Sequence, residues 1–332
     1  MDMSRGLDIG RTKYIFLGGK GGVGKTVLAG AVALESAQQG KTVLLASLNP
    51  VHSLSTLFMQ NVSGGRFCKI EGVDGLTVVE VEISDLIERY RQNMEARLKE
   101  FFKWAEIPIN PEPFIQIATT NPAFQESAMF DKVMDIMVNE GQNYDLVVFD
   151  TAAVANAVRL IGLSKLYGLW LARMIQSRKE AQEYRLRLSI RKEKVMEEIK
   201  KDPVVADLLN LYDKFAKTRE AIVDPEKTRF YFVTTPESLP ISVVKRFISM
   251  VQSFNIPVGG VFVNMVLDRE DVASDPSGYL AAKLEEQRSY LSTIERDMGQ
   301  YIRGYVRMYP TEIRGIKALY NITDDIRQYV PS

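Results

Sequence analysis

A glycine-rich segment near the start of the chain has the composition of a phosphate-binding loop. Residues 18–26 read Gly-Gly-Lys-Gly-Gly-Val-Gly-Lys-Thr, and the last eight of them match the pattern G-x-x-x-x-G-K-[ST]. Glycines let the backbone turn tightly and point N–H groups at phosphate oxygens, a lysine adds charge, and a threonine hydroxyl can ligate Mg²⁺. An apolar run before and a helical stretch after favour nucleotide binding over an empty turn. The predicted binding residues are Gly19, Lys20, Gly21, Gly22, Val23, Gly24, Lys25 and Thr26.

A second stretch ends in a carboxylate that a magnesium nucleotide requires. Residues 144–150 read Tyr-Asp-Leu-Val-Val-Phe-Asp, which predicts a buried strand with Asp150 at its C-terminal end. Beside the loop, this carboxylate can hold Mg²⁺, usually through water. Many buried strands end in aspartate, so this pattern alone is weak evidence of a metal site. It becomes informative because the chain also contains a phosphate-binding loop. We predict Thr26 and Asp150 as the metal-binding residues.

Lys20 is an additional lysine inside the loop, which an ordinary phosphate loop does not need. The form K-G-G-x-G-K-T resembles the deviant-lysine branch of P-loop ATPases. In that branch two subunits face each other across nucleotide, and this lysine reaches the partner's phosphates. The resemblance implies a catalytic role for Lys20, like that of an arginine finger supplied in trans. The alternative is a solvated loop lysine.

The apolar runs predict the elements that position these residues. Strand-like runs alternate with helical stretches at both ends of the chain, which favours an α/β fold with a mostly parallel sheet flanked by helices. We expect residues 84–140 and 155–225 to form a helical lobe inserted into a single domain, residues 1–332. The predicted strands cover residues 14–17, 42–46, 76–82, 144–150, 230–234, 258–263 and 305–309, and the longer predicted helices cover 27–39, 84–104, 123–140, 204–222, 242–254 and 279–301.

Composition excludes several kinds of protein and site. The chain has 332 residues and 42 basic against 42 acidic side chains, so no bulk charge indicates nucleic acid or an anionic membrane surface as a partner. With Cys68 and His52 as the only cysteine and histidine, the sequence excludes an intrachain disulfide and a Cys/His metal cluster within one chain. Residues 1–13 lack a signal-peptide core, and no run reaches the roughly 18 apolar residues of a membrane span. We therefore expect a cytoplasmic protein.

Taken together, several stretches resemble the anion-transporting ATPase family, which contains the arsenical-pump ATPase and the ATPases that target tail-anchored membrane proteins. The resemblance covers nearly the whole chain and implies a P-loop NTPase fold. The loop is shared with many other ATPases, whereas the N-P-x-H-S-L-S and E-I-R-G stretches are far more specific to this family. The matching stretches are residues 19–26, 49–55, 150–152 with Arg159, 263–264 and 312–315.

The resemblance also implies ligands and partners. ATP and Mg²⁺ are the implied cofactors, with Asn264 hydrogen-bonding adenine and residues 307–310, including Met308 and Pro310, walling the base. A turn asparagine and a core strand are the respective alternatives. The implied partners are a second copy of the chain, the hydrophobic helix of a client membrane protein, and a receptor at the membrane.

This chain departs from the family at the position where water is activated. The family has aspartate where this chain has Asn49. An amide can orient water but cannot act as a base at neutral pH, so we expect very slow ATP hydrolysis. Two origins fit this residue equally: a natural variant, or a substitution made to trap ATP.

Two further departures concern coupling and metals. Residues 153–157 read Ala-Val-Ala-Asn-Ala where the family has P-T-G-H-T, which puts the usual coupling between γ-phosphate and the helical lobe in doubt. The chain also lacks the C-x-x-C that clamps a zinc-bridged dimer in some members. It lacks the cysteines that bind arsenite, and metalloid binding of that kind needs thiolates.

The leading hypothesis is therefore a homodimeric Mg·ATP-dependent ATPase that binds hydrophobic transmembrane helices of clients and targets them to a membrane. A surface rich in methionine and aromatic residues on helices 123–140 and 160–175 would suit such clients, although each of these residues alone fits a core better. The alternative is an ATPase subunit of an anion or metalloid efflux system, or another nucleotide-switched carrier.

Overall fold

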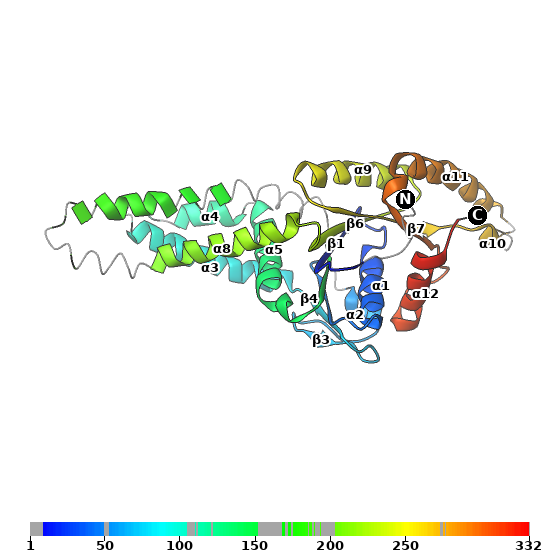
Figure 1. Cartoon of the computed structure of the whole chain (residues 1–332), viewed down its shortest axis with the longest axis horizontal. Helices are drawn as coiled ribbons and strands as arrows, with labels where there is room; N and C mark the ends of the chain where they lie inside the picture. Colours follow the sequence, from blue (N-terminus) through cyan, green and yellow to red (C-terminus); the bar gives the residue numbers. More distant parts are fainter. Residues whose placement is uncertain are drawn as a thin grey trace. The chain divides into compact units, whose positions relative to one another are not determined.

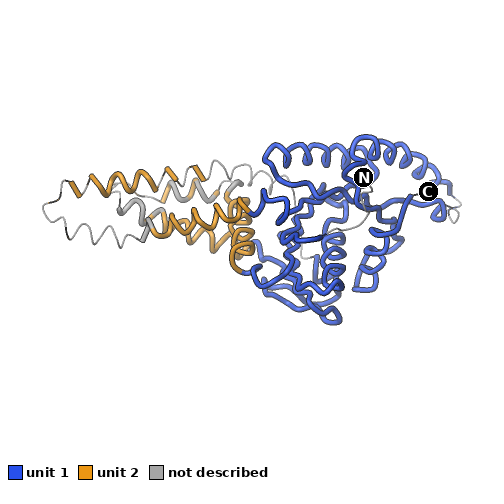
Figure 2. The backbone as a smooth tube through the Cα atoms, viewed as in Figure 1, with its two compact units in different colours: residues 1–83, 140–158, 221–332 blue, residues 84–139, 159–220 orange. Residues whose placement is uncertain are grey.

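The computed structural model of the chain divides into two compact units (Figure 2). The sheet unit comprises residues 1–83, 140–158 and 221–332, and the helical unit comprises residues 84–139 and 159–220. The helical unit occupies the part of the sequence in which the helical lobe is expected. The structure describes residues 9–49, 53–104, 110, 112–120, 122–151, 168–169, 172–173, 175–184, 186–187, 189, 193, 203–272, 275 and 277–331.

Within these residues, eight strands form one sheet in the order β3-β4-β2-β5-β1-β6-β7-β8 (Figure 1). Only β3 runs antiparallel to its neighbour; the other neighbouring strands are parallel. The predicted α/β fold with a mostly parallel sheet is confirmed. The strands are β1 (Tyr14–Gly19), β2 (Val43–Ser47), β3 (Cys68–Lys69), β4 (Leu76–Glu80), β5 (Leu146–Asp150), β6 (Thr228–Thr234), β7 (Val258–Val266) and β8 (Ile302–Arg307).

The central strands are buried on both faces, which explains their continuous apolar runs. Every residue of β1, β2 and β5 is buried. Phe16 of β1 stacks between Phe149 of β5 and Phe230 of β6, with ring centroids 4.5 Å away on each side. This row of rings ties the loop-bearing strand to both of its neighbours.

Helices cover both faces of the sheet. Figure 1 shows α9 and α11 on one side and α1, α2 and α12 on the other. Helix α1 is buried around most of its circumference, because it lies between the sheet and α12. The described helices of this unit are α1 (Lys25–Gln38), α2 (Leu54–Phe58), α9 (Ser238–Ser253), α10 (Arg269–Val272), α11 (Tyr279–Met298) and α12 (Gly315–Gln328), with 3-10 turns at Glu140–Asn143 and Gly299–Tyr301.

Among the predicted strands, the last one differs most from its predicted boundaries. The sequence predicts a strand over residues 305–309, but β8 spans Ile302–Arg307. Gly304 explains the difference, because a Cβ at this position would lie 2.7 Å from the Ile326 carbonyl oxygen of α12. Glycine at position 304 lets β8 pass close to α12. The apolar pattern of the sequence does not indicate this contact between residues far apart in the chain.

The helical unit has its own apolar core. Its helices include α3 (Ile83–Trp104), α4 (Glu112–Thr120), α5 (Pro122–Val138) and α8, which runs Pro203–Val223 and continues into the sheet unit. Phe130 of α5 meets Phe215 of α8 edge to face, with centroids 6.3 Å apart. Met134 and Met137 are buried as well. The α5 side chains proposed from the sequence as a client surface are therefore mostly core, as their helical spacing also allows.

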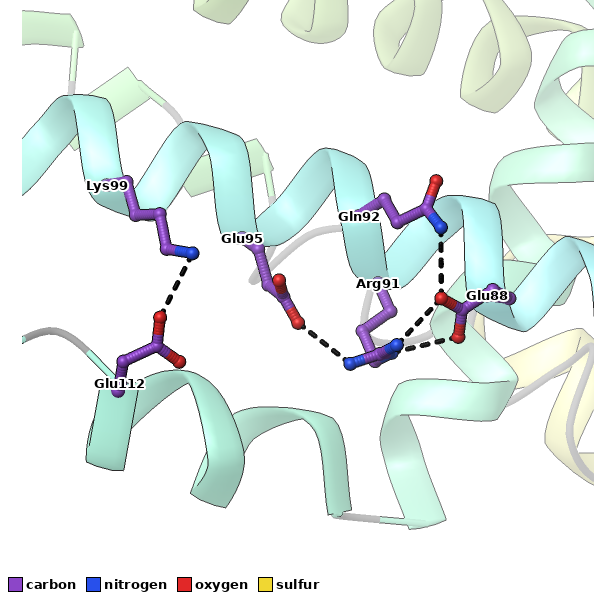
Figure 3. A network of polar contacts seen from close by, with 6 residues as sticks. All are labelled: Glu88, Arg91, Gln92, Glu95, Lys99 and Glu112. Carbon is purple, nitrogen blue, oxygen red and sulfur yellow. Dashed lines mark hydrogen bonds and ion pairs between the residues drawn. The ribbon is translucent and has the colours of Figure 1, made fainter.

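Helix α3 carries a charged stripe. Arg91 bridges Glu88 at 2.7 Å and Glu95 at 3.0 Å, and Lys99 pairs with Glu112 of α4 at 3.0 Å (Figure 3). Exposed pairs of this kind contribute little to stability, because water screens their charges. The stripe keeps this face of α3 hydrated and unsuited to an apolar partner. No described helix is long and apolar enough to cross a membrane.

Candidate functional site

The glycine-rich loop connects β1 to α1 at the carboxyl edge of the sheet. Gly24 precedes α1 in a left-handed conformation, with φ at 90°. Val23 is buried, whereas Lys20, Gly21 and Gly22 are exposed. The loop thus presents its first residues to solvent with a helix N-terminus behind them, which is the arrangement that binds phosphate groups.

Lys25 is held beneath this loop. Its side chain is buried, and Nζ donates a hydrogen bond to the Lys20 carbonyl oxygen at 3.0 Å. Burial lowers the pKa of Lys25, and the negative charge of Asp150 opposes that shift. A buried ammonium group in contact with the loop backbone is placed to attract an anionic ligand into the loop.

Asp150 lies where three strands meet. In the sheet register it pairs with Leu17 of β1 and with Ser47 of β2. The hydroxyl of Thr26 donates to Asp150 Oδ2 at 2.8 Å, and the hydroxyl of Ser47 donates to the same oxygen at 3.2 Å. The structure thus brings together the two residues predicted to bind the metal.

The chemistry of this cluster fits Mg²⁺. Asp150 is fully buried, and burial raises its pKa, while hydrogen bonds from Thr26 and Ser47 and the charge of Lys25 act in the opposite direction. Its second oxygen, Oδ1, is buried without a hydrogen-bond partner among the described residues. Carboxylate and hydroxyl oxygens are the hard ligands that Mg²⁺ prefers.

Asn49 follows β2 at the same edge of the sheet. It is half-buried, and its backbone N–H donates to the Ser47 hydroxyl at 3.3 Å. Ser47 therefore links Asn49, the residue predicted to contact the attacking water, to the Asp150 cluster. Residues 50–52 and 152–167, which include much of the stretches 49–55 and 150–157 compared with the family above, lie outside the described part of the chain.

Sequence reasoning missed Glu80, which anchors the C-terminal end of the stretch 49–55. This buried carboxylate ends β4 and accepts hydrogen bonds from the backbone N–H groups of Leu54, at 2.5 Å, and Ser55, at 3.2 Å. It also accepts from the Ser55 hydroxyl at 2.9 Å. An acidic residue at the end of an apolar run was the available signal, the same one that identified Asp150.

Asn264 contacts the loop itself. It is buried on β7, and its Nδ2 donates to the Val23 carbonyl oxygen at 2.9 Å. A Cβ at Gly24 would lie 2.2 Å from this Nδ2. Asn264 therefore helps to fix the loop, a role that the sequence did not suggest; its contact with adenine stays a prediction.

A cavity of about 370 Å³ opens beside the loop. Its walls come from Lys20 to Val23, from residues 235–237, from α11, and from the methionines Met265 and Met308. Met308 was predicted near the base and does line the cavity. Among the described residues, Pro310 is exposed and is not part of this lining.

Comparison with known proteins matches residues 12–328 to the family described as anion-transporting ATPase. The chain is 28% identical over 289 residues to the putative arsenical pump-driving ATPase 2 of Aquifex aeolicus, covering 85% of this chain and 88% of that one. It is 28% identical over 328 residues to ATPase GET3C of Arabidopsis thaliana, covering 94% and 82%. It is 28% identical over 317 residues to the ATPase ASNA1 homolog of Entamoeba dispar, covering 92% and 91%.

The contact between Gly24 and Asn264 generates a prediction. Gly24→Ala should lower the free energy of unfolding by at least about 2 kcal/mol, because a Cβ there meets the Asn264 amide and the positive φ is strained. Gly21→Ala is the control, since no atom lies within 4 Å of its Cβ position. Denaturant unfolding compares the two variants, and equal stabilities would contradict the role given to Gly24.

Proposed function

Because the chain belongs to the anion-transporting ATPase family, we propose that it is a homodimeric, Mg·ATP-dependent ATPase that binds the hydrophobic helix of a client membrane protein and targets it to a membrane. The observation that carries the nucleotide part is the cluster at the loop, where Thr26 lies 2.8 Å from buried Asp150. The client part is supported by the relatives named GET3C and ASNA1 homolog and by exposed apolar side chains of the helical unit.

In this proposal, different residues of the sheet unit contact the phosphates of ATP, the metal ion and the attacking water. Loop N–H groups and Lys25 bind the phosphates, Thr26 and Asp150 hold Mg²⁺, and Asn49 faces the water that attacks. When bound, Mg²⁺ neutralises charge that develops on the phosphoryl oxygens. Asn49 can hydrogen-bond that water but cannot take its proton, so the ATP-bound state is long-lived.

Lys20 acts across the dimer in this proposal. Its side chain is exposed at the mouth of the loop, while its backbone oxygen already accepts the hydrogen bond from Lys25. Lys25 therefore serves the loop of its own chain, and the Lys20 ammonium group is accessible to nucleotide bound by a second copy.

The helical unit supplies the client surface. Ile117 of α4 is 72% exposed, Leu169 is 62% exposed and Leu209 of α8 is 43% exposed. These side chains replace the α5 residues suggested by the sequence. An efflux role for metalloid is less well supported, because the lone Cys68 is half-buried and no group of metal-binding side chains was found among the described residues.

The client surface is tested with the double variant Ile117→Asp/Leu209→Asp. We expect at least about a tenfold loss in co-purification of a co-expressed single-helix membrane protein, because two apolar side chains that the client helix would cover become charged. Val330→Asp, which changes an exposed apolar residue of the sheet unit, should leave co-purification unchanged. Equal recovery with all three proteins would exclude these helices as the client surface.

The trans role of Lys20 is tested by small-angle scattering with and without Mg·ATP. Lys20→Ala should retain most of the monomer's ATP affinity, since Lys25 remains, but lose the ATP-driven compaction of the dimer. Lys25→Ala should instead bind ATP far more weakly in a titration with a fluorescent analogue. An unchanged compaction in Lys20→Ala would count against its role in trans.

Position 49 is tested by restoring the carboxylate. Asn49→Asp should accelerate phosphate release by about 10²–10⁴, the usual contribution of a general base, with little change in ATP affinity. Asn255→Asp, made in an exposed turn, should change neither quantity. Brisk release by the unmodified chain, unaltered by Asn49→Asp, would show that another residue supplies the base.

A further inference from the structure

The C-terminal end of β7 is irregular where it reaches the cavity. Between the pairs Val263–Tyr305 and Val266–Arg307, β7 has one residue more than β8. Within this bulge Met265 adopts a left-handed conformation, with φ at 59°. That conformation is unfavourable for a residue other than glycine, so surrounding contacts must hold Met265 there.

Two other residues with positive φ have ordinary explanations. Met59 ends α2, and Asn255 follows the end of α9. Left-handed residues are common where helices end, because they let the last carbonyl groups form hydrogen bonds. Met265 lies inside a strand, where no such explanation applies. Bulges of this kind often lie next to binding sites and re-aim side chains.

The bulge aims two consecutive side chains at the nucleotide site. Asn264 is 6% exposed and donates to the loop at Val23, whereas Met265 is 40% exposed and lines the cavity. Met308 lines the same cavity. The backbone N–H of Met308 donates to the Val266 carbonyl oxygen at 2.8 Å, which fixes the two methionine-bearing segments to each other.

Two helices, α11 and α12, brace this arrangement. The buried side chain of Gln287, on α11, accepts from the Leu267 N–H and donates to the Leu267 carbonyl oxygen, both at 2.9 Å. Asp325, buried on α12, accepts from the Arg307 N–H at 3.0 Å and from the Tyr309 hydroxyl at 2.9 Å. The residues on both sides of Met308 are thus fixed. Strain that is held by surrounding contacts in this way is typical of ligand sites.

We propose that Met265 is a specificity-determining residue that, with Met308, forms a thioether-lined slot for the base of the nucleotide. This inference rests on the proposed nucleotide binding. A polarizable thioether interacts favourably with the edge of an aromatic ring, and a flexible methionine fills the space around a planar base closely. The energy stored at Met265 is the cost of placing that sulfur against the base.

The test separates base contacts from phosphate contacts. Calorimetry measures the binding of ATP and of inorganic tripolyphosphate, each with Mg²⁺, to the unmodified chain, Met265→Gly, Met265→Asn and Met59→Gly. Both Met265 variants accept a positive φ, so they should fold. We expect them to bind ATP about threefold to tenfold more weakly and tripolyphosphate with unchanged affinity. Met59→Gly, which relieves the same kind of conformation away from the cavity, should change neither affinity.

Two results would overturn the role of Met265 while leaving ATP binding intact. One is equal ATP affinity in the Met265 variants and the unmodified chain. The other is an equal loss of ATP and tripolyphosphate binding, which would show that the bulge supports the loop rather than the base. Failure of the unmodified chain to bind ATP would refute the proposed function itself, and with it this inference.

Discussion

The contact between the Thr26 hydroxyl and the buried Asp150 carboxylate is the interaction on which the rest of the site depends. A carboxylate without water is costly to keep charged, and burial indeed raises the pKa of Asp150. Two hydroxyl donors and the nearby Lys25 offset that cost. Thr26 and Lys25 belong to α1, and Ser47 belongs to β2. The carboxylate of Asp150 is therefore stabilised only if β1, which leads into α1, and β2 flank β5 in the observed register.

The parallel sheet meets this requirement by bringing the carboxyl ends of its strands to one edge. The loop follows β1, Asn49 follows β2, Asp150 ends β5, and Met308 follows β8. Ligands of open α/β sheets bind at such an edge because the loops that follow the strands converge there. The two segments of the helical unit begin after β4 and after β5, and each of these strands ends in a buried carboxylate of the site, Glu80 or Asp150.

Local patterns predicted the parts of this architecture that depend on neighbours in sequence. The loop motif and the fully buried strands were predictable because glycine spacing and continuous apolar runs reflect backbone geometry and burial. The clamp of Gln287 on Leu267 joins residues 20 positions apart, and the contact of Glu80 with Leu54 joins residues 26 positions apart. The bulge at Met265 depends on pairing with another strand, so no short pattern encodes any of these features. The methionines of α5 show the converse limit, since helical spacing of apolar residues alone does not distinguish a binding face from the core in which Met134 and Met137 lie.

The two lysines of the loop suggest why closure of the proposed dimer should require nucleotide. Lys25 is buried and faces the negative charge of Asp150, whereas Lys20 is exposed. A two-fold interface would bring both loops, each with an exposed lysine, to the same surface. Without an anion these like charges repel and lose hydration as the interface closes, which opposes association. Bound phosphates would replace this repulsion between the two lysines with attraction between each lysine and an anion. One exposed lysine per chain would therefore be enough to make the proposed dimer depend on nucleotide.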